Sequence, residues 1–498
     1  MSRTWDQVKT IRSRIRREVG PLFASGDRRV VLAYPSPYRV GMSSLGYQWI
    51  LSLLRSGGIA AERCFLPDDV DQWRRTGAPP FTYETETPIS SFPLIAVSLA
   101  YELEIAGLIR LLEMAGIPAL QAERGPRDPV ILLGGPLTFS NPLPAAPFVD
   151  AMLIGEADET ALPAVQARFD CDTRDAWLDA VGALPGAFLP ERHGTTLPPV
   201  ARASDALLPA RSVLLSPDAE LSNMFLLEGE RGCHRQCTFC VMRRAPDGGM
   251  RWVTPERILS LIPDYATRVG LVGAAISDHP KLPELLDSLV ASGRGIGVSS
   301  LRADRVARRP RIAELLRESG ARTLTVASDG ASQRLRNAIS KGTTEAHLVS
   351  CARIAGKLGY DVLKVYMMLG LPGEEDDDID ELVDFTVELT RHARVSLGVA
   401  PFVAKRHTPL DGVPFAGIKT VERRLKKLVR GLGGKAKVRS TSARWAWVEY
   451  QLAQGGPEAG LAVRAALRAG GRFADYRRAL LANDTHPSRD RRPTLPHT

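Results

Sequence analysis

Met224-Phe-Leu-Leu-Glu228 is a short apolar run, and Glu230-Arg-Gly-Cys-His-Arg-Gln-Cys-Thr-Phe-Cys240 follows it almost at once. The apolar run predicts a buried strand, and the second stretch places Cys233, Cys237 and Cys240 on the loop after that strand. No second pair of cysteines lies nearby to complete a four-thiolate site. Thiolates grouped this tightly can hold three corners of an iron-sulfur cube and leave one iron open for a substrate or cofactor. The spacing therefore indicates chemistry at the end of this strand.

Two plainer interpretations of the cysteine loop are a structural zinc site and a disulfide. A structural zinc site normally has four ligands spaced in pairs, and His234, directly after Cys233, is poorly placed to complete a tetrahedron. A disulfide needs an oxidising compartment. The other cysteines are scattered singly, and we expect them to be free thiols in apolar surroundings: Cys64, Cys171 and Cys351.

The composition is that of an ordinary globular protein, with 44% hydrophobic and 24% charged residues. A chain of 498 residues exceeds what one hydrophobic core usually organises, so two or three domains are expected. Six cysteines, no apolar span of about 20 residues and no amino-terminal signal pattern predict a soluble cytoplasmic protein without a membrane partner.

The net charge of +9 comes from 65 basic and 56 acidic residues and is diffuse on a chain of this length. One stretch, residues 419–439, concentrates basic side chains between apolar ones at helical spacing. This pattern predicts an amphipathic helix packed on a barrel, with its basic face in solvent. An RNA-contacting patch is the alternative interpretation, although no nucleic-acid module is recognisable.

Short apolar runs alternate with helical patterns over residues 1–165 and again over residues 221–410. The first series predicts strands at 29–34, 93–98, 130–135 and 151–155. The alternation predicts a parallel sheet with ligand sites at the carboxyl ends of its strands. Residues 166–220 are rich in proline and have little periodicity, so we expect an extended connector there.

The second series has six predicted strands, which suit a (β/α)6 partial barrel with its active site where the βα loops gather. These strands are expected at 224–228, 269–276, 297–301, 323–327, 363–369 and 395–400. The cysteines then occupy the first βα loop. Residues 411–483 are expected to form a helical cap over the barrel mouth, and residues 484–498 a disordered tail.

The motif Cys-x3-Cys-x2-Cys, with aromatic Phe239 before the third cysteine, resembles the signature of the radical SAM superfamily. The resemblance implies that the three thiolates bind a 4Fe-4S cluster and that the open iron is chelated by the amino and carboxylate groups of S-adenosylmethionine (SAM). Phe239 would then lie against the adenine. The family cleaves SAM reductively to a 5'-deoxyadenosyl radical, and its members take the electron from a donor such as flavodoxin or ferredoxin.

Later loops extend the resemblance and also depart from it. Gly273 and Ala274 stand where the family usually has a Gly-Glu pair that holds the methionine amino group. Because the glutamate is missing, backbone carbonyls would have to serve. Ser328-Asp329 stands where related proteins tend to carry Pro-Glu. The remaining residues that the resemblance assigns to SAM binding are Ser299, Ser300, Arg302, Leu371, Pro372 and Gly373, the last three within a Gly-Leu-Pro-Gly-Glu turn.

The first 165 residues resemble the Rossmann-like cobalamin-binding-type domain that precedes many radical SAM barrels. The residues that carry this resemblance, and that would line a cobalamin site, are Tyr34, Pro35, Gly41, Ser98, Gly134, Gly135, Gly155 and Glu156. This segment contains no histidine, which excludes a histidine ligand to cobalt from it. Both a cobalamin-binding domain and one that keeps the fold without the cofactor are compatible with the sequence.

The sequence therefore predicts a radical SAM enzyme with a 4Fe-4S cluster, SAM and, as an option, cobalamin. Cobalamin-dependent methyl transfer is one reaction open to it. Cobalamin-free oxidoreductase chemistry and a methylthiotransferase-like reaction are others, although the latter lacks an auxiliary cysteine triad. The alternative from another class is a degenerate cluster-binding scaffold or electron carrier that cleaves no SAM, suggested by the missing glutamate.

Overall fold

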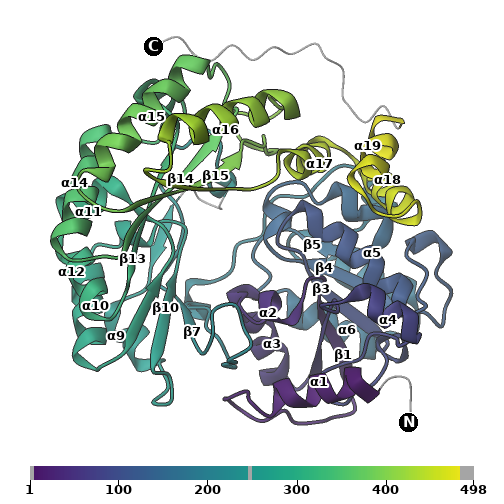
Figure 1. Cartoon of the computed structure of the whole chain (residues 1–498). Coiled ribbons are helices and arrows are strands. Elements are labelled where there is room, and N and C mark those ends of the chain that lie inside the picture. The colour runs from purple at the N-terminus through teal and green to yellow at the C-terminus, as the bar shows by residue number, and fades with distance from the viewer. Residues whose placement is uncertain (1–4, 245–248, 483–498) are drawn as a thin grey trace. The chain divides into compact units, whose positions relative to one another are not determined.

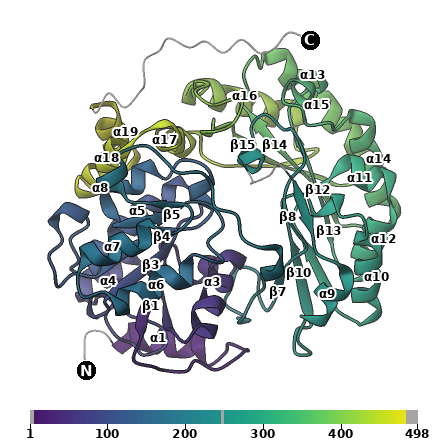
Figure 2. The same cartoon turned by 180° about the vertical axis from the view of Figure 1, so that it is seen from behind.

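The computed structural model describes residues 5–244 and 249–482, which form two compact units. Among the described residues, the first unit contains residues 5–225 and 455–482, and the second contains residues 226–244 and 249–454. Figures 1 and 2 show the chain from opposite sides. Within the described residues, no helix is both long enough and apolar enough to cross a bilayer.

A six-stranded sheet organises the first unit, in the order β2-β1-β3-β4-β5-β6. The first five strands in this order are mutually parallel and β6 is antiparallel. This confirms the parallel Rossmann-like sheet, whose order reverses direction between β1 and β3. The bounds are β1 Arg29–Tyr34, β2 Ala60–Phe65, β3 Leu94–Ser98, β4 Val130–Gly134, β5 Ala151–Leu153 and β6 Ala187–Phe188.

The sequence did not predict β2, because charged Glu62 and Arg63 lie in the middle of Ala-Ala-Glu-Arg-Cys-Phe. Both side chains are buried, and ion pairs accommodate their charges. Arg63 pairs with Glu18 and Glu84 at 2.6 Å each, and Arg29 pairs with Glu62 at 2.7 Å. Because these ion-pair partners come from distant segments, no local sequence pattern predicts them.

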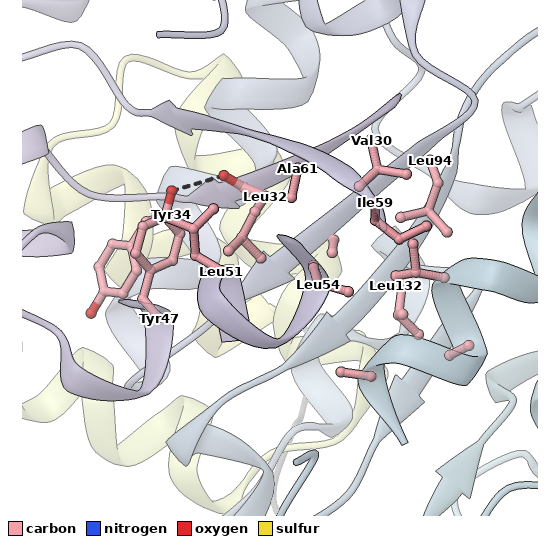
Figure 3. Packing of buried hydrophobic residues seen from close by; sticks show 14 of the residues in the cluster. Val30, Leu32, Tyr34, Tyr47, Leu51, Leu54, Ile59, Ala61, Leu94 and Leu132 are labelled. Atoms are coloured by element: carbon pink, nitrogen blue, oxygen red, sulfur yellow. Dashed lines mark hydrogen bonds between the residues drawn. The ribbon is translucent and has the colours of Figure 1, made fainter. Parts of the chain in front are cut away.

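Helices cover the sheet and bury its apolar side chains. Figure 3 shows one face, where Tyr47 from α3 donates a hydrogen bond of 2.9 Å to the carbonyl oxygen of Leu32 on β1. Leu51 and Leu54 on the same helix are fully buried there. The helices up to residue 193 are α1 Trp5–Ile15, α2 Tyr38–Gly41, α3 Leu45–Ser56, α4 Val70–Thr76, α5 Ile105–Met114, α6 Ala161–Asp170, α7 Arg174–Gly182 and α8 Pro190–His193.

The segment expected as a connector, residues 166–220, differs from that expectation. It contains the end of α6, the helices α7 and α8, and the strand β6, and it belongs to the first unit. Several of its prolines stand outside regular elements, and Pro190 occupies the first turn of α8, where its missing N–H costs nothing. The frequency of proline therefore wrongly suggested an extended connector where the chain forms helices and a strand.

The segment expected as one helical cap, residues 411–483, is divided between the two units. Helices α18 (Pro457–Arg468) and α19 (Phe473–Ala482) belong to the first unit, where α18 packs against α5 and the 3-10 helix η5 (Leu143–Phe148). Asn141 donates a hydrogen bond of 2.7 Å to the Gly455 carbonyl oxygen. Residues 484–498, expected as a tail, lie outside the described residues.

The second unit is a partial barrel of parallel strands, as predicted, in two sheets ordered β11-β10-β7 and β12-β13-β14-β15-β16. Strand β16, which pairs with β15, was not predicted. The bounds are β7 Phe225–Glu228, β10 Arg268–Val272, β11 Gly295–Val298, β12 Leu301–Arg302, β13 Thr323–Asp329, β14 Val362–Leu369, β15 Val395–Pro401 and β16 Lys437–Ser440. A small antiparallel hairpin, β8 (Glu230–Gly232) with β9 (Met250–Trp252), follows the first strand.

Helices alternate with the barrel strands, and α10, α11, α12 and α14 lie on the same side of them in both views (Figures 1 and 2). The bounds are α9 Pro255–Ser260, α10 Leu282–Ala291, α11 Ala303–Arg308, α12 Arg311–Glu318, α13 Gln333–Ala338, α14 Glu345–Lys357, α15 Asp376–Thr390, α16 Ile418–Leu432 and α17 Ala443–Gln454.

The basic stretch forms the amphipathic helix α16, as predicted, but its basic face is not simply solvated. Lys427 donates a hydrogen bond of 2.6 Å to Asp380 on α15, and Arg423 pairs with Asp376 at the start of α15. The acidic run after Glu374 therefore neutralises part of α16, in addition to lying at the positive end of the α15 dipole. Ion pairs thus compensate Arg423, Arg424 and Lys427 among the basic side chains of residues 419–439.

The packing of α18 can be tested at Gly460, where an added Cβ would lie 1.8 Å from the Pro144 carbonyl oxygen. We expect Gly460→Ala to destabilise the first unit by about 1–3 kcal/mol through overpacking. Gly46→Ala on α3 is the matched control, because an added Cβ there meets nothing within 4 Å. The control should be neutral or stabilising by up to about 1 kcal/mol. Urea unfolding measures both, and equal effects would contradict the packing described.

Candidate active site

The three cysteines lie on the loop between the hairpin strands β8 and β9. Cys237 is buried and Cys233 and Cys240 are partly buried, and all three are free thiols. Burial raises the pKa of Cys233 and of Cys240 above the ordinary thiol value. The backbone N–H of Arg235 points to the Cys233 sulfur at 3.4 Å. A positive metal centre would therefore be needed to hold these sulfurs as thiolates.

Asp278, at the end of the 3-10 helix η9 (Ile276–Asp278) after β10, anchors this loop. Its carboxylate accepts two hydrogen bonds of 2.7 Å from the Arg235 guanidinium and a further one from Arg305 on α11. These hydrogen bonds and charges hold the pKa of Asp278 below its usual range against the opposing effect of burial. His234, which follows Cys233 directly, lies with Nε2 3.7 Å from the same carboxylate.

A second anchor lies on the other side of the loop. The Thr238 N–H donates a hydrogen bond of 3.1 Å to the Ile339 carbonyl oxygen, just after α13. Two residues further on, Lys341 pairs with Asp329 at the end of β13, and its positive charge lowers the pKa of Cys240, opposing burial. Asp329 has a φ of 62°, a strained conformation for a residue with a side chain. The predicted SAM residue Asp329 is thus held near the cysteine loop.

The donor set fits a 4Fe-4S cluster, although the sulfurs are not gathered in advance. Within residues 5–244 and 249–482, no three metal-ligating side chains already surround a common point. The loop nevertheless supplies three soft thiolate donors within eight residues and no fourth cysteine, which suits a cluster with one open iron. The scattered cysteines take no part: Cys64 and Cys351 are buried, and burial raises the pKa of Cys351 to about 12.

The other predicted SAM residues are divided between the solvent and the framework of the barrel. Ser299 and Ser300 are exposed between β11 and β12, and Phe239 is partly buried in the turn that joins Cys237 to Cys240. Arg302 is buried, pairs with Asp304 at 2.9 Å and donates to the Lys341 carbonyl oxygen at 3.0 Å. Its guanidinium is therefore engaged within the barrel.

Ser328 and the turn after β14 are also tied to the framework. The Ser328 hydroxyl donates a hydrogen bond of 3.0 Å to the Gly330 carbonyl oxygen. In the turn that contains Leu371, Pro372 and Gly373, buried Glu374 accepts a hydrogen bond of 2.8 Å from the Gly370 N–H and one of 2.9 Å from Arg424 on α16. Glu374 thus closes the turn, and α16 holds the turn in place.

Glu230, on β8 directly before the cysteines, is the site residue that the sequence did not identify. It is 1% exposed, and its Oε1 accepts a hydrogen bond of 2.7 Å from the Ala275 N–H. A Cβ at Gly273 would lie 2.4 Å from the same oxygen, so the carboxyl occupies the space beside this glycine. Ala274, between them, is exposed. Two features of the sequence could have pointed to Glu230: its position just before the cysteine loop, and the absence of a glutamate from the Gly-Glu position.

In the first unit, several residues proposed to bind cobalamin make contacts between backbone segments at the carboxyl ends of the strands. Gly135 has a φ of 103°, and an added Cβ would lie 2.6 Å from the Leu99 carbonyl oxygen. At Gly155, with a φ of 104°, an added Cβ would lie 2.6 Å from the Ala201 backbone. Glu156 accepts a hydrogen bond of 2.9 Å from the Ala203 N–H. These positions thus serve close backbone approach within the domain.

The strand ends at the topological switch point are likewise bound to one another. Buried Glu104 accepts hydrogen bonds from Ser36 at 2.9 Å and from the Ala100 N–H at 2.6 Å, which joins the loops after β1 and β3. These loops adjoin Tyr34, Pro35 and Ser98, and α5 packs closely on Pro35. Gly41 lies against Phe65, and Gly134 ends β4. Contacts within the fold therefore explain these candidate residues, except at Gly134, where an added Cβ would meet nothing within 4 Å.

Two family models match this chain. The model described as "Radical SAM proteins, N-terminal" matches residues 46–190, and that of the radical SAM superfamily matches residues 229–386, which include the cysteine loop. The chain belongs to the radical SAM superfamily. The match covers most of the partial barrel, and it makes this protein an enzyme of that superfamily.

Curated relatives extend the comparison. An uncharacterized protein of Methanocaldococcus jannaschii is 25% identical over 413 residues, which are 80% of this chain and 84% of the relative. The FeFe hydrogenase maturase subunit HydE of Thermotoga maritima is 25% identical over 190 residues, which are 37% of this chain and 53% of that protein.

Solved structures share the fold. The radical SAM methyltransferase TsrM of Kitasatospora setae aligns with a TM-score of 0.55 at 15% identity, covering 80% of this chain and 76% of TsrM. The cobalamin-dependent SAM radical enzyme OxsB aligns with a TM-score of 0.50 at 15% identity, covering 82% of this chain and 57% of OxsB. At these identities the likeness is one of fold.

The environment of Glu230 predicts a pH-dependent stability in the cofactor-free protein. Burial, supported by the nearby Glu228 and Asp278, raises the pKa of Glu230 to about 7 from 4.5. The folded state therefore loses stability as pH rises from about 4.5 to 7, because the unfolded chain ionises this carboxyl there while the folded chain keeps it protonated. We expect Glu230→Gln to be more stable than the unsubstituted protein by about 2–3 kcal/mol at pH 8 and nearly equal at pH 4.5.

Urea unfolding at the two pH values measures this difference. Asp287→Asn, at an exposed ion pair with Arg311 on the same unit, is the control and should change little at either pH. A Glu230→Gln effect of the same size at pH 4.5 and pH 8 would contradict the prediction, because it could not arise from ionisation of this carboxyl.

Proposed function

We propose that this protein cleaves SAM reductively, with a 4Fe-4S cluster held by Cys233, Cys237 and Cys240. The observation that carries the proposal is the position of these thiols on the loop after the first barrel strand, within the region that matches the superfamily. A bound cluster of this kind supplies an electron to the SAM sulfonium and generates a 5'-deoxyadenosyl radical. Flavodoxin or ferredoxin is the proposed electron donor, and a reducing cytoplasm is the proposed location.

The residues of this chain would prepare the site for that chemistry. The Asp278 carboxylate fixes the Arg235 guanidinium and hence the middle of the cysteine loop. The Lys341 and Asp329 pair lies on the opposite side of the loop and brings a positive charge toward Cys240. A positive charge near a thiol favours its thiolate, the form that binds iron. The Lys341 charge offsets part of the effect of burial, which still keeps the pKa of Cys240 above the ordinary thiol value, so a bound metal would have to favour the thiolates further.

The proposal is tested with single cysteine variants. We expect Cys233→Ser, Cys237→Ser and Cys240→Ser each to lower the iron and sulfide retained after anaerobic reconstitution at least severalfold and to abolish 5'-deoxyadenosine formation after dithionite reduction. Each substitution removes a thiolate that the cluster needs. Cys171→Ser, at a partly buried free thiol in the first unit, is the matched control and should retain both properties.

The same assay separates catalysis from a scaffold or electron carrier. A protein that holds about four irons and gives a paramagnetic signal on reduction, yet forms no 5'-deoxyadenosine, would support the scaffold. Zinc in place of iron, or cluster retention by all three variants, would contradict the proposal itself.

A second candidate function is cobalamin-dependent methyl transfer. The fold likeness to TsrM and OxsB, which extends over about four fifths of this chain, favours it. The contacts of Gly135, Gly155 and Glu104 do not add to that support, so we derive no step through cobalamin.

The visible absorption spectrum tests the second candidate independently of the first. If the second candidate holds, protein incubated with cobalamin and then gel-filtered carries corrin absorbance at about one equivalent per chain. The protein eluting without corrin absorbance would remove methyl transfer from cobalamin and leave SAM cleavage unaffected. Free cobalamin passed through the same column is the control for carry-over.

A further inference from the structure

We propose that Glu230 binds the α-ammonium group of the methionine part of SAM, and so replaces the glutamate missing from Gly273-Ala274. This inference rests on the proposed function, because it assumes that SAM binds beside the cysteine loop. It assigns a positioning residue that comes from β8 and not from the end of β10, where the sequence resemblance would have placed it.

The geometry places the Glu230 carboxyl at the residues flanking Ala274. On one side, its Oε1 accepts the Ala275 N–H at 2.7 Å. On the other, a Cβ at Gly273 would lie 2.4 Å from Oε1 and 2.8 Å from the carboxyl carbon. The absence of a side chain at Gly273 thus leaves room for the carboxyl in its present position. The loop after β10 thus lacks an acidic side chain of its own and is shaped to receive one from β8.

The second carboxyl oxygen gives the independent observation. Oε2 of Glu230 is buried and has no hydrogen-bond partner among the described residues. A buried carboxylate oxygen without a donor is costly, and in native proteins it commonly marks the place of a missing water, ion or ligand. An alkylammonium carries three N–H donors and a full positive charge, which makes it a suitable partner for this oxygen.

The neighbouring carboxylates are already engaged, which singles out Glu230. Glu228 accepts hydrogen bonds of 2.7 Å and 2.9 Å from Arg231. Asp278 accepts the guanidinium of Arg235 and a hydrogen bond from Arg305. Of these three carboxylates at the base of the cysteine loop, Glu230 has no arginine partner in the structure. A cationic ligand therefore gains most by meeting Glu230.

The position of Glu230 in the chain adds a functional consequence. It precedes Cys233 by three residues, with Arg231 and Gly232 between them on β8. The segment that carries the first cluster ligand would then also hold the amino group of the cofactor that the open iron binds. A carboxyl on β8 thereby sets the distance between cofactor and cluster more directly than one on the separate loop after β10.

A binding cycle with two ligands tests the inference. Equilibrium dialysis on anaerobically reconstituted full-length protein compares SAM with an analogue in which hydrogen replaces the α-amino group. We expect Glu230→Gln to weaken SAM binding about 10- to 100-fold, as loss of a charged hydrogen bond does. Binding of the analogue should change less than threefold, because it has no ammonium to lose.

The electron paramagnetic resonance spectrum of the reduced cluster is the second measurement, and it requires no turnover. SAM should change the spectrum of Glu230→Gln only at concentrations raised by the same factor as the dissociation constant. Glu228→Gln is the matched control: it removes a neighbouring charge on the preceding strand, and its affinities for both ligands should stay within threefold of the unsubstituted protein.

Each other outcome overturns the inference. If Glu230→Gln weakens SAM and the analogue equally, the carboxyl supports the loop and does not meet the ammonium. If SAM binding is unchanged, Glu230 has no part in it. Failure of the proposed function would give a different result. The unsubstituted protein with its cluster would then bind neither ligand and form no 5'-deoxyadenosine.

Discussion

The buried Asp278 carboxylate, with arginine guanidinium groups from two segments, holds the site together. Arg235 comes from the cysteine loop and Arg305 from α11, while Asp278 itself follows β10. Removing one partner from a buried ion pair typically costs about 3–5 kcal/mol, because the other charge is left without compensation. In its described residues, the loop between the hairpin strands contains one short 3-10 helix, Val241–Arg244. Its position relative to the barrel therefore depends on this carboxylate.

Both units bury charged side chains that ion pairs compensate. In the first unit, Arg63 on β2 lies between the carboxylates of Glu18 and Glu84. In the second, Arg424 on α16 reaches Glu374 in the turn after β14. Glu230 differs from these carboxylates, because among the described residues it has no cationic partner, and its Oε2 accepts no hydrogen bond. A cationic ligand would therefore stabilise the Glu230 carboxyl more than a carboxylate that already has an arginine partner.

Glycines at strand ends have different roles in the two units. Gly135 and Gly155 permit backbone segments of the first unit to approach one another, which the fold alone explains. Gly273 makes room for a carboxyl from another strand. All three look alike in the sequence, since each follows an apolar run. Only the atom that an added Cβ would meet distinguishes a packing glycine from one that shapes a site.

The sequence by itself determined the alternation of strands and helices, the partial barrel and the cysteine loop after its first strand, because burial periodicity and ligand spacing are local properties of the chain. It also predicted the amphipathic helix α16. Tertiary structure decided the features that depend on distant partners. In the first unit, these are the burial of the charged strand β2 and the packing of residues 455–482. In the second unit, they are the contact between the basic face of α16 and the acidic α15, and the position of the Glu230 carboxyl beside Gly273. Electrostatic compensation and close packing act between residues far apart in sequence, so no local pattern specifies them.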